Sequence, residues 1–117
     1  MSSNPVVHFE IASEHAKELQ AFYSQLFGWK VDTNNPVEYG VVDTGSERGI
    51  AGGIGPAMGG PNRVTFYVEV DDLQAYLDKA VSLGGKVLME PDAVPGGPRI
   101  AMFQDPDGNI TGLTQAR

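Results

Sequence analysis

Hydrophobic and polar residues alternate at the start of the chain and then change period. From Val6 to Ile11 the odd-numbered positions are apolar and share one face of an extended segment, as in a half-buried strand. From Ala16 to Phe27 apolar residues recur every three or four positions, which is typical of one stripe on a helix. The pattern predicts a strand over 6–11, followed by a helix that Ser13 caps and Gly28 ends.

Three short strands are predicted after this helix. The apolar runs are Trp29–Val31, Val37–Asp43 and the glycine-rich Gly49–Gly55. Turn residues separate them at Asn34–Pro36 and Gly45–Glu47. The first half of the chain therefore has the order strand, helix and three strands.

The second half repeats this order. An alternating strand over Arg63–Val70 leads into a helix that Asp71 or Asp72 caps and Gly84 ends. The predicted strands that follow are Lys86–Met89, Arg99–Gln104 and Ile110–Gln115. We expect a single domain over residues 1–117, with a first module at 5–55, a glycine-rich linker at 56–62 and a second module at 63–117.

Composition and charge exclude several classes of function. The 117 residues include no cysteine, so disulfides, thiolate metal sites and a cysteine nucleophile are excluded. The net charge of -7 and the scattered basic residues argue against a nucleic-acid partner. No apolar run approaches the roughly 20 residues of a membrane span, and no secretory signal is evident at the N-terminus. We expect a cytoplasmic protein without a membrane partner.

Three stretches resemble the vicinal-oxygen-chelate superfamily, which includes glyoxalases, bleomycin-resistance proteins and dioxygenases. They are His8–Ile11 with the helix that closes in Ala21–Trp29, then Val68–Leu73, and last Phe103–Asn109. The resemblance implies an α+β fold in which two βαβββ modules form a curved, eight-stranded mixed sheet around a cleft. It also implies a homodimer.

The predicted strand faces place a group of polar and aromatic side chains toward that cleft. Val7, Phe9 and Ile11 should pack on the helices, which leaves the even-numbered positions of the first strand for a ligand. The candidate ligand-binding residues are His8, Glu10, Tyr39, Thr65, Tyr67, Glu69 and Gly112. His8, Glu10 and Glu69 are also the candidates for acid–base catalysis.

The resemblance implies a divalent metal held by His and Glu from the first and last strands of each module. Of these positions His8 keeps a ligand, whereas Thr65 and Gly112 stand where the family has His and Glu. The run Gly49–Gly55 offers no ligand side chain in any register. Because a stable site normally needs three or more protein ligands, we predict no tightly bound metal and no other cofactor.

Three functions remain open on this basis. A cleft without metal would bind a small organic molecule, as in drug or metabolite sequestration by bleomycin-resistance proteins. Alternatively, His8 with Glu10 or Glu69 would transfer protons without a metal. The third possibility is an atypical metal-dependent lyase, isomerase or dioxygenase. The sequence does not decide whether the protein is an enzyme.

Overall fold

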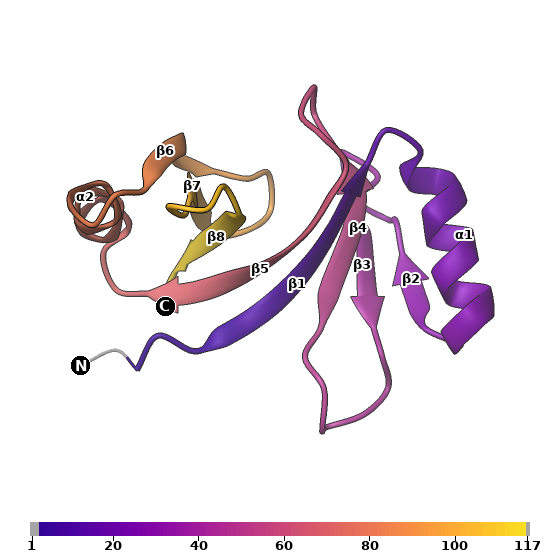
Figure 1. Ribbon diagram of the computed structural model, residues 1–117. Helices are drawn as coiled ribbons and strands as arrows, with labels where there is room; N and C mark the ends of the chain where they lie inside the picture. Colours follow the sequence, from indigo (N-terminus) through magenta and orange to yellow (C-terminus); the bar gives the residue numbers. More distant parts are fainter. Residues whose placement is uncertain (1–2, 117) are drawn as a thin grey trace. The chain divides into compact units, whose positions relative to one another are not determined.

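A computed structural model describes residues 3–116. The predicted domain also includes residues 1, 2 and 117, which lie outside the described residues. The elements are β1 (Val6–Ser13), α1 (Ala16–Phe27), β2 (Lys30–Asp32), β3 (Gly40–Asp43), β4 (Gly52–Pro56), β5 (Arg63–Val70), α2 (Leu73–Ser82), β6 (Lys86–Ala93), β7 (Arg99–Gln104) and β8 (Ile110–Gln115) (Figure 1). Within the described residues, the expected eight-stranded mixed sheet with two helices is confirmed, and the sheet is open rather than closed into a barrel.

The chain divides into two compact units. The first unit is His8–Val64, and the second combines the chain up to Val7 with the chain from Thr65 onward. Neither helix in the described part of the chain is long and apolar enough to cross a membrane.

In the first unit the strands run in the order β2-β3-β4-β1, with β1 parallel to β4 and the other pairs antiparallel. Helix α1 lies against β4 and β2 (Figure 1). The core consists of Ile11, Val42 and Ile54, and partly buried side chains that include Phe9 and Trp29 pack around it. Trp29 packs against Phe9 of β1 and Tyr23 of α1 and so lies between the sheet and the helix.

Helix α1 ends as the sequence predicts but begins differently. Gly28 follows the last turn in the left-handed conformation, with φ of 74°, and its N–H donates to the Ser24 carbonyl. The prediction that Ser13 caps the helix is wrong. Ser13 ends β1, its hydroxyl accepts from the His15 N–H, and His15 occupies the cap position without a side-chain hydrogen bond.

Only part of the predicted apolar stripe of α1 is covered. Leu19 and Tyr23 pack against the core, whereas Phe22, Leu26 and Phe27 are each more than half exposed. No residue of α1 is buried. The periodicity correctly indicates a helix but overstates how much of its surface lies against the sheet.

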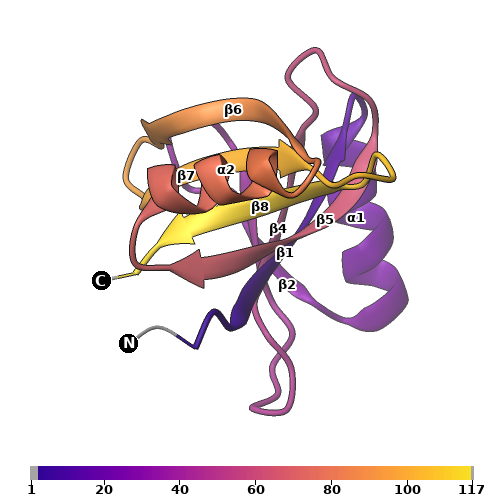
Figure 2. The ribbon, with the colours of Figure 1, turned by 60° about the vertical axis from the view of Figure 1, so that its left-hand side comes forward.

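In the second unit the strands run in the order β5-β8-β7-β6, with β5 parallel to β8 and the other pairs antiparallel. Helix α2 packs against β6, β7 and β8 (Figure 2). The Asp72 side chain accepts from the Ala75 N–H, so Asp72 is the cap residue. Leu73 and Leu77 from this helix lie in a buried core that also contains Val70, Ala101 and Leu113.

Several strand boundaries differ from the predictions. Strand β3 begins at Gly40 rather than at Val37, because the Asn35 side chain accepts from the Val37 and Tyr39 N–H groups and holds this segment in a loop. Strand β4 is shifted to Gly52–Pro56. Strand β6 continues to Ala93 through register shifts that interrupt the ladder, and it tolerates proline because it lies at an edge of its unit.

Candidate functional site

Two residues of β1 and one loop residue are joined by hydrogen bonds in the first unit. His8 Nε2 lies 3.0 Å from the Tyr39 hydroxyl oxygen. The same hydroxyl donates to Glu10 Oε2 at 2.9 Å. His8 and Glu10 are two positions apart on one strand and therefore point to the same face, as the alternation predicts. Tyr39 thus joins the two predicted polar residues of β1.

Arg63 extends this series of contacts, and the sequence did not identify it as a candidate site residue. Its Nη2 lies 3.7 Å from Glu10 Oε1, and the two side chains keep only 18% and 14% of their accessible area. Arg63 Nε is buried without a hydrogen-bond acceptor in the described structure. We call His8, Tyr39, Glu10 and Arg63 the His8 cluster. It combines an imidazole, a phenol, a carboxylate and a guanidinium in one small region.

The loop before β3 fixes the position of Tyr39. The Asn35 amide accepts from the Tyr39 N–H at 2.9 Å and donates to the Tyr39 carbonyl at 2.6 Å. The turn signal at Asn34–Pro36 therefore has a second role, because the same asparagine that shapes the loop also anchors the tyrosine. The sequence predicted Tyr39 as a ligand-binding residue but placed it within a strand rather than in this loop.

Glycines of β4 make room for aromatic rings from two directions. A side chain at Gly53 would overlap the Tyr39 ring, and one at Gly55 would approach the same ring to 2.5 Å. A side chain at Gly52 would overlap the ring of Phe9. In the structure, protein rings fill that space.

Burial sets the protonation of His8. Desolvation lowers the pKa of His8 below its ordinary value of 6.5, and the nearby Glu10 carboxylate opposes this only in part. The imidazole is therefore neutral at neutral pH, with one ring nitrogen protonated and the other carrying a lone pair.

The predicted site residues of the second unit lie on β5 and β8. The Thr65 hydroxyl donates to the Ile110 carbonyl, which gives it a structural partner. Tyr67 pairs with Gly112 across the two strands and is only 5% exposed, and a side chain at Gly112 would overlap the Tyr67 ring. Glu69 is partly buried, and its backbone N–H donates to the Pro5 carbonyl.

These residues do not fit the divalent metal that the resemblance implies. No three His, Asp or Glu side chains within residues 3–116 gather in a way that could hold a metal ion. At Gly112, where the family has a glutamate, the Tyr67 ring occupies the space that a side chain would need. At Gly53 of β4, the Tyr39 ring likewise occupies the space that a side chain would need. His8 Nε2 already interacts with the Tyr39 hydroxyl.

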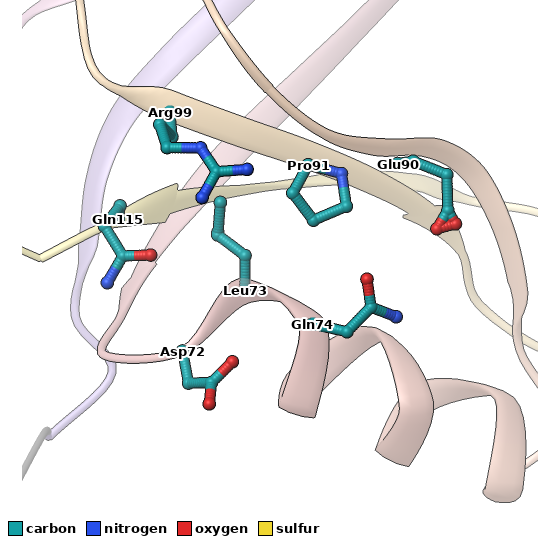
Figure 3. Close-up of a pocket in the computed structure, with 7 residues that line it drawn as sticks. All are labelled: Asp72, Leu73, Gln74, Glu90, Pro91, Arg99 and Gln115. Carbon is teal, nitrogen blue, oxygen red and sulfur yellow. The ribbon is translucent and has the colours of Figure 1, made fainter.

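An open pocket of about 390 Å³ lies elsewhere, beside the start of α2 in the second unit. It is lined by Asp72, Leu73, Gln74, Glu90, Pro91, Arg99 and Gln115 (Figure 3). Asp72 caps the helix, and Gln115 donates to the Asp71 carbonyl, so two of its polar side chains stabilise the fold. We place the candidate site at the His8 cluster instead, because that is where titratable groups are held in contact.

Comparison with known proteins agrees with the fold. The model of the glyoxalase/bleomycin resistance protein/dioxygenase superfamily matches residues 6–112, which is nearly the whole chain. This chain belongs to that superfamily. The match spans both units and includes β1 with His8 and β8 up to Gly112.

Two relatives illustrate the range of similar proteins. A putative glyoxylase, CFP32, of Mycobacterium tuberculosis (strain CDC 1551 / Oshkosh) is 36% identical over 102 residues, which are 81% of this chain. The chain spans only 39% of the length of that relative. A glyoxylase-like domain-containing protein of Didymella fabae is 31% identical over 113 residues, which cover 86% of this chain and 84% of the relative.

Solved structures share the fold at low sequence identity. The hypothetical protein BH1468 from Bacillus halodurans C-125 has a TM-score of 0.71 at 15% identity, over 99% of this chain and 96% of that one. Methylmalonyl-CoA epimerase from Mycobacterium tuberculosis has a TM-score of 0.66 at 15% identity, over 100% of this chain and 93% of that one. At these identities the similarity concerns the fold and carries no substrate to this chain.

Proposed function

We propose that this protein binds a small organic molecule without a metal ion, and that the His8 cluster supplies the polar contacts. The observation that supports this most strongly is the hydrogen bond between His8 and Tyr39, because it engages a nitrogen that a metal would otherwise take. The Tyr67 ring over Gly112 supports the same conclusion at another position of the family's metal site. The degenerate metal site is part of this proposal.

The chemistry of the cluster suits a polar ligand with an aromatic or sugar-like body. Glu10 accepts hydrogen bonds, Arg63 donates them, and the rings of Tyr39 and His8 lie nearly parallel, with centroids 6.4 Å apart. We further propose that residues 1–117 act as a single domain and that Thr65, Tyr67, Glu69 and Gly112 are also ligand-binding residues. Sequestration of a drug or metabolite is the biological role that fits such a site.

A second candidate function is proton transfer without a metal, as in a lyase or isomerase. The chain from His8 through Tyr39 to Glu10 favours it, because a carboxylate at its end would stabilise the imidazolium that forms when His8 takes a proton. The fold neighbour named as an epimerase supports a reaction of this class. Binding remains the first proposal, since it requires only the contacts and no turnover.

A thermal-shift screen tests the binding proposal. Hydroxylated aromatic compounds and sugars, with catechol and glucose as the simplest members, are added to the wild type and to Glu10→Gln and Tyr39→Phe. We expect at least one compound to raise the Tm of the wild type and to lose this effect in both variants. Tyr23→Phe is the matched control, because Tyr23 packs in the aromatic core of the same unit. A rise that persists equally in both cluster variants would contradict the proposed site.

We make two further proposals, both expected from the sequence: the protein forms a homodimer, and it is cytoplasmic. Sedimentation equilibrium of the full chain tests the first of them, with a mass of twice 12.5 kDa as the expected result and the mass of a single chain as the contrary one.

A further inference from the structure

The open pocket beside the start of α2 combines a cavity with two opposite charges. We propose that it binds a small zwitterion whose carboxylate and ammonium groups are joined by a short apolar chain. The volume of about 390 Å³ lies within the range of small-molecule sites, about 300–1,000 Å³. All the lining residues belong to the second unit, so this site is distinct from the His8 cluster and does not depend on it.

A bulge in β6 shapes one wall of the pocket. Glu90 and Pro91 both line it, although adjacent residues of a regular strand point to opposite faces. The register of β6 on β7 shifts between Met89 and Asp92, where Glu90 and Pro91 together oppose the single residue Ala101. Such a bulge re-aims side chains. It therefore explains how a carboxylate and a proline ring from neighbouring positions reach the same pocket (Figure 3).

Two opposite charges line the pocket without neutralising each other. Arg99 of β7 and Glu90 of β6 are both exposed. The ion pairs and side-chain hydrogen bonds within residues 3–116 include neither of these side chains. The guanidinium keeps its charge throughout the physiological pH range and offers five N–H donors. The pocket thus presents a cationic and an acidic contact point to one occupant.

The remaining polar side chains are held by bonds within the second unit. Asp72 caps α2, and Gln74 Nε2 donates to Asp78 Oδ1 at 2.9 Å. The Gln115 side chain donates to the Asp71 carbonyl. These bonds fix the positions of the other walls, and they leave the guanidinium and the carboxylate described above as the groups that can select a ligand.

Strand register separates the two charges. Arg99 pairs with Ala93, which lies three residues beyond Glu90 on β6. At about 3.3 Å per residue, the two backbone positions are roughly 10 Å apart along the strand. In the view of Figure 3, Pro91 lies between the two charged side chains and offers apolar surface. A ligand that contacts both charges therefore needs an apolar chain between its own charged groups.

The charge balance of the pocket favours a zwitterion over a simple ion. Arg99 suits a carboxylate, which a guanidinium binds through paired N–H···O bonds. Glu90, together with Asp72 at the start of α2, suits an ammonium group. An inorganic anion would meet two acidic side chains, and a simple cation would meet the guanidinium. A molecule that carries both charges avoids each of these repulsions.

Amide proton–nitrogen NMR of the full-length protein at neutral pH tests the site, with ε-aminocaproate as the probe. We expect shifts at the amides of Asp72, Gln74 and Arg99. Caproate and pentylamine each lack one of the two charges, and glycine lacks the apolar chain, so all three should bind about tenfold more weakly or worse. The absence of shifts at millimolar probe, shifts confined to the first unit, or equal affinity for caproate would overturn the inference.

Variants assign each charge to its ligand group. Arg99→Gln should weaken ε-aminocaproate binding about tenfold and leave pentylamine binding unchanged, and Glu90→Gln should weaken it similarly and leave caproate binding unchanged. Arg48→Gln and Glu47→Gln make the same charge changes at exposed positions between β3 and β4, and should have no effect. Equal weakening by these control variants would show that net charge rather than the pocket attracts the probe, and would contradict the site. None of these outcomes bears on the His8 cluster.

Discussion

The two units have the same order of elements but divide stability and chemistry between them. Helix α2 buries Leu73 and Leu77 in an aliphatic core, whereas α1 buries no residue fully and packs through partly exposed aromatic rings. The first unit instead contains the His8 cluster, in which four polar side chains contact one another. We conclude that the repeated fold allows one half to contribute a tight aliphatic core while the other holds a cluster of polar side chains in contact.

A tyrosine over a glycine occurs in both units, with different consequences. Tyr67 lies on β5, directly opposite Gly112, and is almost fully buried. Tyr39 lies in a loop, reaches over Gly53 and bonds to His8 and Glu10. The first ring covers a glycine of the neighbouring strand, and the second places a hydroxyl in the candidate site.

The largest expected effect comes from the contrast between the helices. Leu77→Ala should lower the free energy of unfolding by about 2–5 kcal/mol, because Leu77 is fully buried and a cavity would remain. Leu26→Ala, at a position that is 57% exposed on α1, should change it by less than about 0.5 kcal/mol. Urea denaturation followed by circular dichroism measures both. Equal losses would mean that α1 is covered as completely as α2.

Substitution of the glycines beneath the two tyrosine rings should give the next largest loss of stability. Gly112→Ala and Gly53→Ala should each lower the free energy of unfolding by about 1–3 kcal/mol, since the new methyl group would overlap a tyrosine ring. We expect the larger loss at Gly112, because the new methyl group would meet the body of the Tyr67 ring there, whereas at Gly53 it would meet the hydroxyl end of the Tyr39 side chain, which can move aside while its backbone stays in place. Gly60→Ala, where a methyl group meets only ordinary contacts, is the control in the same denaturation series. A larger loss at Gly53 would reverse the comparison.

Acidification should produce a smaller effect that is specific to the first unit. Because the pKa of His8 is lowered in the folded protein, the unfolded chain binds a proton first as the pH falls through about 6.5. The Tm should therefore decrease from pH 7.5 downward through this range, and His8→Gln should flatten that part of the profile. The control variant His15→Gln should still show this decrease in Tm. A profile that His8→Gln leaves unchanged would show that burial of His8 does not affect its titration.

Much of the fold was predictable because periodicity depends on local geometry. The alternation in β1 placed His8 and Glu10 on one face, and the glycine after α1 marked its end. Exposure was less predictable, because a helical stripe indicates which residues are apolar but not whether a neighbouring element covers them. Phe22 and Leu26 illustrate this limit.

The candidate site was predictable only in part. Arg63 was missed because its contact with Glu10 joins residues far apart in sequence, and basic residues without a motif give no local signal. The roles of Gly53 and Gly112 depend on which ring lies above each glycine, which follows from the placement of a loop and from strand register. Sequence patterns indicate candidates for a site, but cross-strand register decides which of them meet.

The most direct test of binding without a metal is the metal content of protein purified without chelators, together with the change in Tm when nickel, cobalt, manganese, iron or zinc is added. We expect no stoichiometric metal and no rise in Tm, because the Tyr39 and Tyr67 rings fill the space above Gly53 and Gly112. Near-stoichiometric metal, or a rise in Tm that His8→Ala abolishes, would contradict the central claim.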